Sequence, residues 1–198
     1  MFRKKRLEIL LESLETHPSP DVTREQYSTP ATIAAELLHF AFMQGDLNGT
    51  VYDLGCGTGI LAIGAKLLGA KKVLGFDSDG VAIKIARKNA RGVGVSVKFV
   101  ESEVKKISGK ADAVIMNPPF GAQHRHADRA FLKKAFELAD VVYSIHNAGS
   151  REFIKKFISP CVITHCIPVP FVLKRTFHFH KKDMVVRRVE LYRMERKR

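Results

Sequence analysis

The sequence has few cysteines, no long apolar run and a shortage of acidic residues, and each shortage excludes a class of protein. Its three cysteines (Cys56, Cys161 and Cys166) are odd in number and form no CxxC pair, so neither a disulfide framework nor a metal site is indicated. No apolar run is long enough to cross a bilayer, and the N-terminus does not have the pattern of a signal peptide. We therefore expect a soluble, cytoplasmic protein in a reducing compartment.

The shortage of acidic residues leaves a strongly basic chain. Among 198 residues, 33 are Lys or Arg and 20 are Asp or Glu, which makes the formal net charge +13. Residues 1–6 carry +4 and residues 174–198 carry +7, whereas the long stretch between them carries only +2. Basic clusters of this kind suit a phosphate backbone, although a solvated terminus is an alternative interpretation.

From residue 50 onward, short apolar runs alternate with amphipathic segments. We predict strands at 50–53, 72–77, 95–100, 111–116 and 141–145. We predict helices at 59–68, 81–92, 131–139 and about 150–158. Two further apolar runs, 161–166 and 184–194, have no helix between them, which favours an antiparallel pair. The fold class is therefore α/β, a doubly wound, mostly parallel, seven-stranded Rossmann-like sheet that ends antiparallel.

The length predicts one domain over residues 1–198, with a helical extension at 1–48 and the sheet-containing core at 49–198. Leucines at helical spacing indicate an amphipathic helix over residues 3–15, which packs on the domain or on a partner. A second helix begins near Pro30, with Thr29 expected as its N-cap. Capping does not explain Gln26 and Tyr27, and a loop in this position can contact a small zwitterionic cofactor.

The segment Asp53-Leu54-Gly55-Cys56-Gly57-Thr58-Gly59 follows a predicted strand and opens a helix, a context in which glycines let the backbone approach a ligand. The dinucleotide fingerprint GxGxxG requires a third glycine where this chain has Ile60. The carboxylate of Asp53 would also repel a pyrophosphate. It would attract S-adenosylmethionine, which carries an ammonium and a sulfonium, and we predict that cofactor.

Acidic residues follow the next two predicted strands. Asp77 is placed to accept both hydroxyls of a ribose, and an Asx-rich turn is the alternative. Glu103 is placed to receive the adenine amino group with Val104 against the ring, and a solvated loop carboxylate is the alternative. Because Asp53, Asp77, Glu103 and Asn117 all lie at or just beyond predicted strand ends, we expect them at one edge of the sheet.

The segment Asn117-Pro118-Pro119-Phe120 follows a buried strand and is suited to holding a planar amino group. The side-chain carbonyl of Asn117 and a backbone carbonyl of the proline pair can each accept a hydrogen bond from an exocyclic NH2. The two prolines restrict the backbone and hold these acceptors in place, while Phe120 supplies a face for stacking a base. A strand-ending turn is the alternative interpretation.

Aromatic and basic residues are interleaved over residues 174–182. Such a mixture is typical of a surface that binds single-stranded RNA, and the candidate RNA contacts are Lys174, Arg175, His180, Lys181 and Lys182. The alternative is a hairpin whose phenylalanines pack into the core.

Taken together, these motifs resemble those of the methyltransferase-like adenine-N6 methyltransferases that act on small-subunit ribosomal RNA in archaea and eukaryotes. The similarity runs from about residue 5 to residue 194 and is carried by Glu25-Gln26-Tyr27-x-Thr29, Asp53-Leu-Gly-Cys-Gly, Gly75-Phe-Asp77-x-Asp79, Val114-Ile-Met-Asn117-Pro-Pro-Phe-Gly121, Ala130-Phe-Leu, Val142-Tyr-Ser and Phe179-His180-Lys181-Lys182.

The resemblance implies an enzyme that uses S-adenosylmethionine to methylate N6 of an adenine in RNA. It implies that Asn117 to Phe120 hold the adenine and that the cofactor pocket is lined by Gln26, Thr29, Gly55, Thr58, Asp77, Glu103 and Val104. The family more often has Asp where this chain has Glu103, which puts that adenine contact in question. The family also works with a small zinc-ribbon activator subunit that covers an apolar surface.

Three other functions are compatible with parts of the pattern. Relatives that methylate a protein glutamine also use Asn-Pro-Pro followed by an aromatic, usually Tyr, but they carry a separate recognition domain. DNA adenine methyltransferases use the same pocket with a target-recognition domain, which this chain lacks. A catalytically silent module that binds S-adenosylmethionine and RNA is the third, and the intact Asn117-Pro118-Pro119-Phe120 argues against it.

Overall fold

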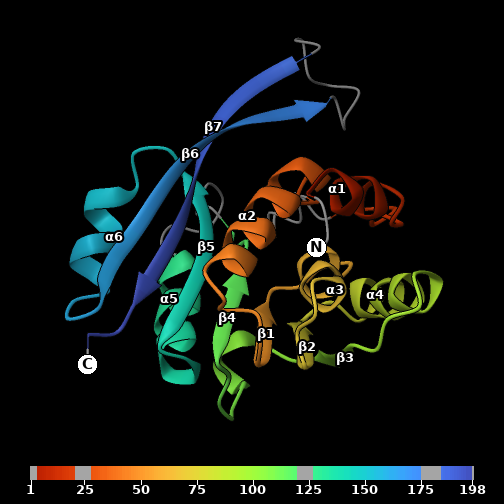
Figure 1. Ribbon diagram of the computed structural model, residues 1–198, viewed down its shortest axis with the longest axis horizontal. Helices are drawn as coiled ribbons and strands as arrows, with labels where there is room; N and C mark the ends of the chain where they lie inside the picture. Colours follow the sequence, from red (N-terminus) through yellow and green to blue (C-terminus); the bar gives the residue numbers. More distant parts are fainter. Residues whose placement is uncertain (1–3, 21–27, 120–126, 175–183, 198) are drawn as a thin grey trace.

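Seven strands form one sheet in the order β3-β2-β1-β4-β5-β7-β6 (Figure 1). The computed structural model describes residues 4–20, 28–119, 127–174 and 184–197. The strands are β1 (Thr50–Leu54), β2 (Lys72–Asp77), β3 (Lys98–Glu101), β4 (Ala113–Met116), β5 (Val141–Asn147), β6 (Val162–Lys174) and β7 (Met184–Glu195). The helices are α1 (Lys4–Glu12), α2 (Ala31–Met43), α3 (Ile60–Leu67), α4 (Gly80–Gly92), α5 (Ala127–Leu138) and α6 (Arg151–Phe157), with a 3₁₀ turn η2 at Val104–Lys106.

The direction of the strands follows the way they are connected. β1 pairs with β2 and β4, β2 with β3, and β4 with β5, all in parallel. The last two strands have no helix between them, and β7 pairs antiparallel with both β5 and β6. A parallel neighbour needs a long crossover, usually a helix, whereas an antiparallel neighbour does not. The doubly wound, mostly parallel sheet and its antiparallel end are therefore confirmed.

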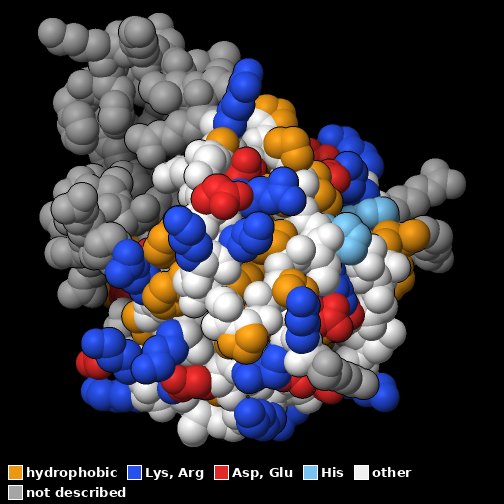
Figure 2. Space-filling view, turned by 90° about the vertical axis from the view of Figure 1, so that its left-hand side faces the viewer, with side chains coloured by type: hydrophobic (Ala, Val, Ile, Leu, Met, Phe, Trp, Pro, Cys, Tyr) orange, Lys and Arg blue, Asp and Glu red, His pale blue; other side chains and the backbone are white. Residues whose placement is uncertain are grey.

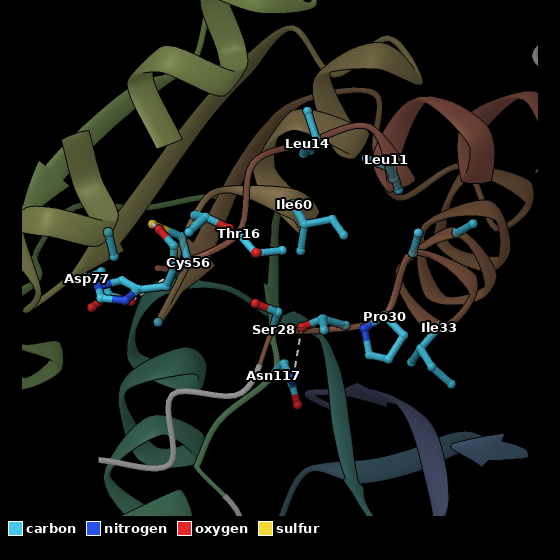
Figure 3. Close-up of a pocket in the computed structure, with 18 of the residues that line it drawn as sticks. Leu11, Leu14, Thr16, Ser28, Pro30, Ile33, Cys56, Ile60, Asp77 and Asn117 are labelled. Atoms are coloured by element: carbon cyan, nitrogen blue, oxygen red, sulfur yellow. Dashed lines mark hydrogen bonds between the residues drawn. The ribbon is translucent and has the colours of Figure 1, made fainter. Parts of the chain in front are cut away.

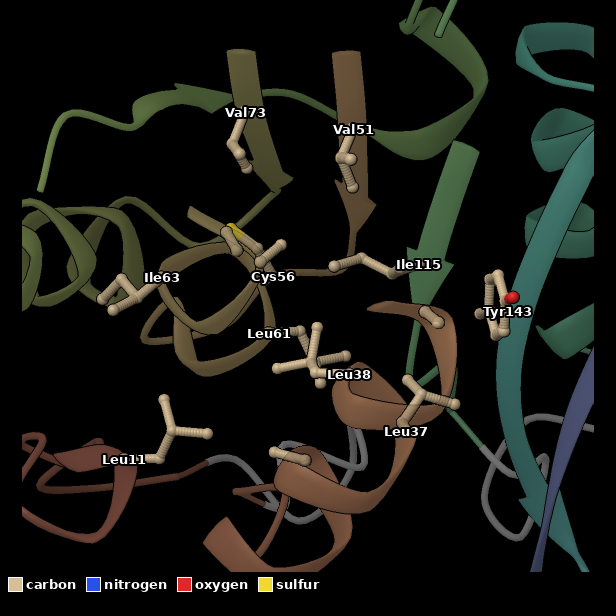
Figure 4. Packing of buried hydrophobic residues seen from close by; sticks show 14 of the residues in the cluster. Leu11, Leu37, Leu38, Val51, Cys56, Leu61, Ile63, Val73, Ile115 and Tyr143 are labelled. Carbon is tan, nitrogen blue, oxygen red and sulfur yellow. The ribbon is translucent and has the colours of Figure 1, made fainter. Parts of the chain in front are cut away.

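The two faces of the sheet are covered by different helices, and alternate residues of each strand supply the two cores. Val51 of β1 and Ile115 of β4 pack in a cluster with Leu37 of α2 and Leu61 of α3 (Figure 4). The neighbouring strand residues, including Tyr52 and Val114, pack on the other face with α5 and α6. Burial of a sheet on both faces explains why its parallel strands are short apolar runs.

The apolar side of α1 packs against α2 and α3 of the same domain. Leu7 and Leu11 are 0% and 2% exposed and belong to the same core cluster as α2 and α3. Gly64 in α3 allows α2 to lie close to α3, since a Cβ at that position would lie only 2.3 Å from Cδ1 of Leu38 in α2. Of the two predicted roles for the first helix, packing on the domain or on a partner, its leucines are used for the first.

β6 is longer than the sequence pattern predicted. The run 161–166 was expected as a strand, but β6 continues to Lys174 and remains paired with β7 as far as Met184. β5 pairs with β7 only as far as Val189, so the distal half of the β6–β7 hairpin projects beyond the sheet (Figure 1). Pro168 and Pro170 lie within β6, and prolines are tolerated there because β6 is an edge strand.

None of the helices within the described residues is both long and apolar enough to cross a membrane. Across the same ranges, no group of three or more His, Cys, Asp or Glu side chains is arranged to hold a metal ion.

Candidate active site

A cavity of ≈ 1040 Å³ opens at the carboxyl ends of β1, β2 and β4. Figure 3 shows Cys56 and Asp77 at one end of it, Leu11, Pro30 and Ile33 at the other, and Asn117 between them. Pockets for single ligands usually have volumes of about 300–1,000 Å³, so this one has room for a cofactor and a reacting group together. We call the part lined by Gly55 to Thr58 and Asp77 the donor end, and the part around Thr29 and Asn117 the acceptor end.

Asp77 is fixed at the donor end by the backbone of two loops. Its Oδ2 accepts from the N–H of Gly57 at 2.8 Å, and its Oδ1 accepts from the N–H of Asp79 at 2.9 Å. Burial raises the pKa of Asp77, and these two hydrogen bonds oppose that rise. Each carboxylate oxygen keeps a second lone pair, so Asp77 can still accept from a ligand.

The glycines of the loop have different roles. Gly57 has φ +51, and a Cβ there would meet no heavy atom within 4 Å, so its backbone borders open space in the pocket wall. Gly59 has φ +91, and a Cβ there would lie 2.9 Å from Cζ of Phe99. Gly59 was predicted to contact the cofactor, but it lies outside the cavity lining. Its small size instead allows the start of α3 to pack against β3.

Asp53 was predicted to present a negative charge beside the loop, and the structure places its side chain elsewhere. The residue is 0% exposed, and its Oδ2 accepts from the N–H of Ala62 in α3 at 2.9 Å. Its Oδ1 is buried without a hydrogen-bond partner in the described part of the chain. Burial, and to a smaller extent the charge of Asp77, raises the pKa of Asp53 to about 8. The carboxyl is therefore mostly protonated at neutral pH and lies outside the cavity lining.

Glu103 and Val104 are neighbours in the sequence, but only Val104 lines the cavity. Glu103 precedes η2, is exposed, and pairs with Lys106 at 3.2 Å instead of lining the cavity. Val104 does line it, together with Ser102 and Ile107. A polar residue after a strand can point either way; the Glu103 side chain is exposed here, and its contact with adenine stays a prediction.

The acceptor end joins residues 88 positions apart in the sequence. Nδ2 of Asn117 donates to Oγ1 of Thr29 at 2.9 Å (Figure 3). Oδ1 of Asn117 is buried and has no hydrogen-bond partner among the described residues. Thr29 was predicted as the N-cap of the second helix, and this is wrong: Pro30 occupies that position, with no side-chain cap hydrogen bond. The Thr29 hydroxyl instead orients the Asn117 amide.

Comparison with known proteins shows where similarity lies along the chain. Residues 34–118 match the family model of ribosomal protein L11 methyltransferase (PrmA). An uncharacterised protein of Methanocaldococcus jannaschii is 40% identical, over 99% of this chain and 95% of that protein. The rRNA N(6)-adenosine-methyltransferase METTL5 of Danio rerio is 34% identical, over 97% of this chain and 98% of that protein. The chain belongs to the METTL5 family of methyltransferases.

A solved crystal structure has nearly the same fold as this METTL5 family member. The crystal structure of a candidate RNA methyltransferase from Pyrococcus horikoshii has 43% sequence identity and a TM-score of 0.92. The alignment covers 99% of this chain and 98% of that one. The PrmA match ends at Pro118, so it includes the donor end and the start of the Asn-Pro-Pro segment, whereas the METTL5 match extends through the β6–β7 hairpin.

Several predicted site residues of this METTL5 family member lie outside the described residues: Gln26, Tyr27, Phe120, Arg175, His180, Lys181 and Lys182. Lys174 is the last residue of β6. Pro118 is buried, and Pro119 lines the cavity beside Asn117.

The sequence interpretation missed one wall of the cavity. Leu14, Glu15, Thr16 and His17 follow α1 and line the cavity, with Thr16 near Cys56 and Leu14 near Leu11 (Figure 3), although they were assigned only to a helix and the stretch after it. His17 Nε2 lies 3.2 Å from Oδ2 of Asp79, without hydrogen-bond geometry. No local pattern marks these residues, because their role depends on α1 packing beside α3.

Proposed function

We propose that this chain transfers a methyl group from S-adenosylmethionine to N6 of an adenine in ribosomal RNA, most specifically that of the small subunit. Membership of the METTL5 family supports methyl transfer, and the Danio rerio relative is named for rRNA N6-adenosine methylation. Residues 1–198 act as a single methyltransferase domain in this proposal, since the helices before residue 49 share a core cluster with the sheet.

The observation that carries the proposal is that Oδ1 of Asn117 is buried and has no hydrogen-bond partner in the part of the chain that the structure describes. A buried acceptor without a partner costs about 1–3 kcal/mol, so its presence at a cavity suggests that a ligand supplies the donor. Because Nδ2 of the same amide is held by Thr29, the oxygen is the amide atom that still lacks a hydrogen-bond partner among the described residues. An exocyclic amino group of adenine is such a donor.

The residues at the donor end fit S-adenosylmethionine. Asp77 has lone pairs available for ribose hydroxyls, Gly57 allows close approach of the backbone, and Val104 offers an apolar surface for the adenine ring. When bound, S-adenosylmethionine supplies a methyl group activated by its sulfonium charge. Gln26, Tyr27, Asp53, Gly59 and Glu103 complete the predicted cofactor set, although the last three residues lie outside the cavity lining.

The protein then has little acid–base chemistry to perform, and its residues act by positioning. Asn117 Oδ1 and the carbonyl of Pro118 accept the two N6 hydrogens and orient the nitrogen lone pair towards the donor end. Phe120 stacks on the extruded base. The proton released from N6 after methyl transfer leaves to water.

Two surfaces serve the macromolecular partners in this proposal. The hairpin residues Lys174, Arg175, His180, Lys181 and Lys182 contact RNA phosphates. Figure 2 shows the side of the molecule that carries α6, where the described Lys and Arg side chains are spread among fewer acidic ones. Arg151, Lys155 and Lys156 of α6 are exposed.

A small zinc-ribbon activator pairs with β3, which is an edge strand of the sheet.

One experiment tests the reaction and the substrate together. The protein is incubated with labelled S-adenosylmethionine and, in parallel, with small-subunit ribosomal RNA, large-subunit ribosomal RNA, duplex DNA and a protein release factor, with and without the activator. We expect N6-methyladenosine after nuclease digestion of the small-subunit RNA. Label in methylglutamine or in DNA would replace the RNA proposal, and cofactor binding without transfer to any acceptor would indicate a silent module.

A second experiment tests the RNA surface. Charge reversal of Lys181 and Lys182 should weaken RNA binding and lower the salt dependence of the affinity, because each released phosphate contact reduces the slope by about one. Unchanged affinity and slope would exclude the hairpin tip from the RNA interface.

A further inference from the structure

Asn89 is a polar residue on the buried side of α4. The other buried residues of this helix are Ala82, Ile83, Ile85, Ala86 and Ala90. Asn89 is 7% exposed, and an amide in this environment is unfavourable unless its donors and acceptor are satisfied. An apolar residue would suit helix packing better, so the amide calls for another explanation.

The Asn89 amide joins two walls of the donor end. Its Oδ1 accepts from the N–H of Glu15 at 2.9 Å, and its Nδ2 donates to the carbonyl of the same residue at 2.9 Å. Nδ2 also donates to the carbonyl of Thr58 at 3.0 Å. Both Nδ2 hydrogens and the oxygen are used, and the side chain thereby links the segment after α1 to the glycine-rich loop.

The linked segment, Leu14–His17, borders the same cavity as the loop. Its far end lies against the next loop, where Nε2 of His17 is 3.2 Å from Oδ2 of Asp79. The main-chain N–H of Asp79 in turn donates to Oδ1 of Asp77, the expected ribose acceptor. The segment is therefore hydrogen-bonded to Asn89, and through it to the glycine-rich loop, and its His17 end lies beside the loop that holds Asp77.

We propose that Asn89 is a positioning residue of the methyl-donor pocket, which holds Leu14–His17 against the glycine-rich loop as a fixed wall. This inference rests on the proposed function, because it takes S-adenosylmethionine as the ligand of the donor end. Asn89 itself lies outside the cavity lining, so it acts through the backbone of Glu15 and Thr58. The N-terminal extension is then part of the cofactor site and not an appendage to the core.

The test compares three full-length variants with the wild type: Asn89→Ala, Asn89→Asp and Lys88→Ala. Lys88 is the matched control, because it is adjacent on α4 and ion-pairs with the Glu15 side chain at the surface, whereas Asn89 bonds the Glu15 backbone. Asn89→Asp has nearly the same shape as asparagine but cannot donate to either carbonyl, so it remains informative if Asn89→Ala fails to fold. Affinity for S-adenosylmethionine is measured by calorimetry, and amide hydrogen exchange is measured at Glu15.

We expect both Asn89 variants to bind S-adenosylmethionine about tenfold more weakly, as for the loss of one or two net hydrogen bonds, and to exchange the Glu15 amide faster. The KM for the cofactor should rise by a similar factor, while kcat at saturation changes by less than about twofold. Lys88→Ala should change affinity by less than about twofold.

Faster exchange at Glu15 with wild-type cofactor affinity would overturn the inference and leave Asn89 a purely structural role. An equal loss of affinity in Lys88→Ala would also overturn it. If the wild type itself binds no S-adenosylmethionine, the proposed function fails along with this inference. If the wild type binds and methylates RNA but the Asn89 variants match it, only this inference fails.

Discussion

Asp77 at the donor end of the cavity and Asn117 at the acceptor end differ in how completely their side-chain oxygens are paired within the described residues. At the donor end, Asp77 accepts two backbone N–H groups and Asn89 uses all of its amide groups. At the acceptor end, the Asn117 amide is held on one side by Thr29, and its oxygen has no partner among the described residues. A group whose hydrogen bonds are already formed is held in place before its ligand binds. A buried group without a partner is destabilising until a ligand supplies the missing hydrogen bond.

This difference indicates a division of work between the two ends. The donor end should determine cofactor affinity, and the acceptor end should determine turnover. Four substitutions test that division, beginning with the one for which we expect the largest effect.

Asn117→Ala should lower kcat for RNA methylation about 10³-fold, because it removes the acceptor that orients the reacting amino group. The Kd for S-adenosylmethionine should change by less than about twofold. Single-turnover methyl transfer and calorimetry measure the two quantities. Asn48→Ala, at an exposed position in the turn before β1, is the matched control. Comparable losses of affinity and rate would end the proposed division between the two ends.

Asp77→Ala should weaken S-adenosylmethionine binding by about 100-fold, because it removes a charged acceptor of ribose hydroxyls and frees the Gly57 N–H. Glu103→Ala is informative beside it: Glu103 is exposed and paired with Lys106, so we expect less than a twofold change. Equilibrium binding to each variant gives the comparison. A large loss in Glu103→Ala would restore its predicted contact with adenine.

Thr29→Val should lower kcat by up to about tenfold, because a methyl group of similar size replaces the hydroxyl that holds the Asn117 amide. Cofactor affinity should be nearly unchanged. Thr29→Ser keeps the hydroxyl and should retain most of the activity. If Val and Ser variants are equally active, the Thr29–Asn117 hydrogen bond does not contribute to turnover.

Asp53→Asn should have little effect on affinity or rate and should instead alter how stability depends on pH. The folded-state pKa of Asp53 is about 8, above its ordinary value of 3.8. Its stabilising contribution is therefore complete below about pH 4 and is lost as the pH rises towards 8. The free energy of unfolding, measured with urea, should fall between pH 5 and pH 9 in the wild type. In the variant this fall should be smaller, by on the order of a few kcal/mol. An identical pH dependence would contradict the protonated state.

The elements of the fold were largely predictable because their signals are local. The strand predicted at 50–53 is Thr50–Leu54, and the helix predicted at 81–92 is Gly80–Gly92. Strand and helix periods alternate over short stretches, so burial patterns can be recognised without knowledge of distant residues. β6 was predicted too short, because Pro168 and Pro170 are acceptable only on an edge strand, and edge position depends on the whole sheet.

The site was predictable to a smaller extent. Gly55, Gly57, Thr58, Asp77, Val104 and Asn117 do lie together around one cavity, as expected from parallel strands that end at a common edge. The side chains of Asp53 and Glu103 could not be placed from the sequence, because their direction depends on α3 in one case and on solvent in the other. Thr29 was taken for a helix cap, since its partner lies 88 residues away.

The sequence by itself determined the succession of strands and helices along the chain and the positions of the polar segments that follow them. It also determined the family to which the motifs are similar. These properties depend on local periodicity and on residue identity. Only the tertiary structure decided that Thr29 orients Asn117, that Asp53 is buried and that Asn89 ties Glu15 to the glycine-rich loop. The reason is that hydrogen-bond partners and burial are set by which surfaces meet when α1, α2 and α4 pack around the edge of the sheet.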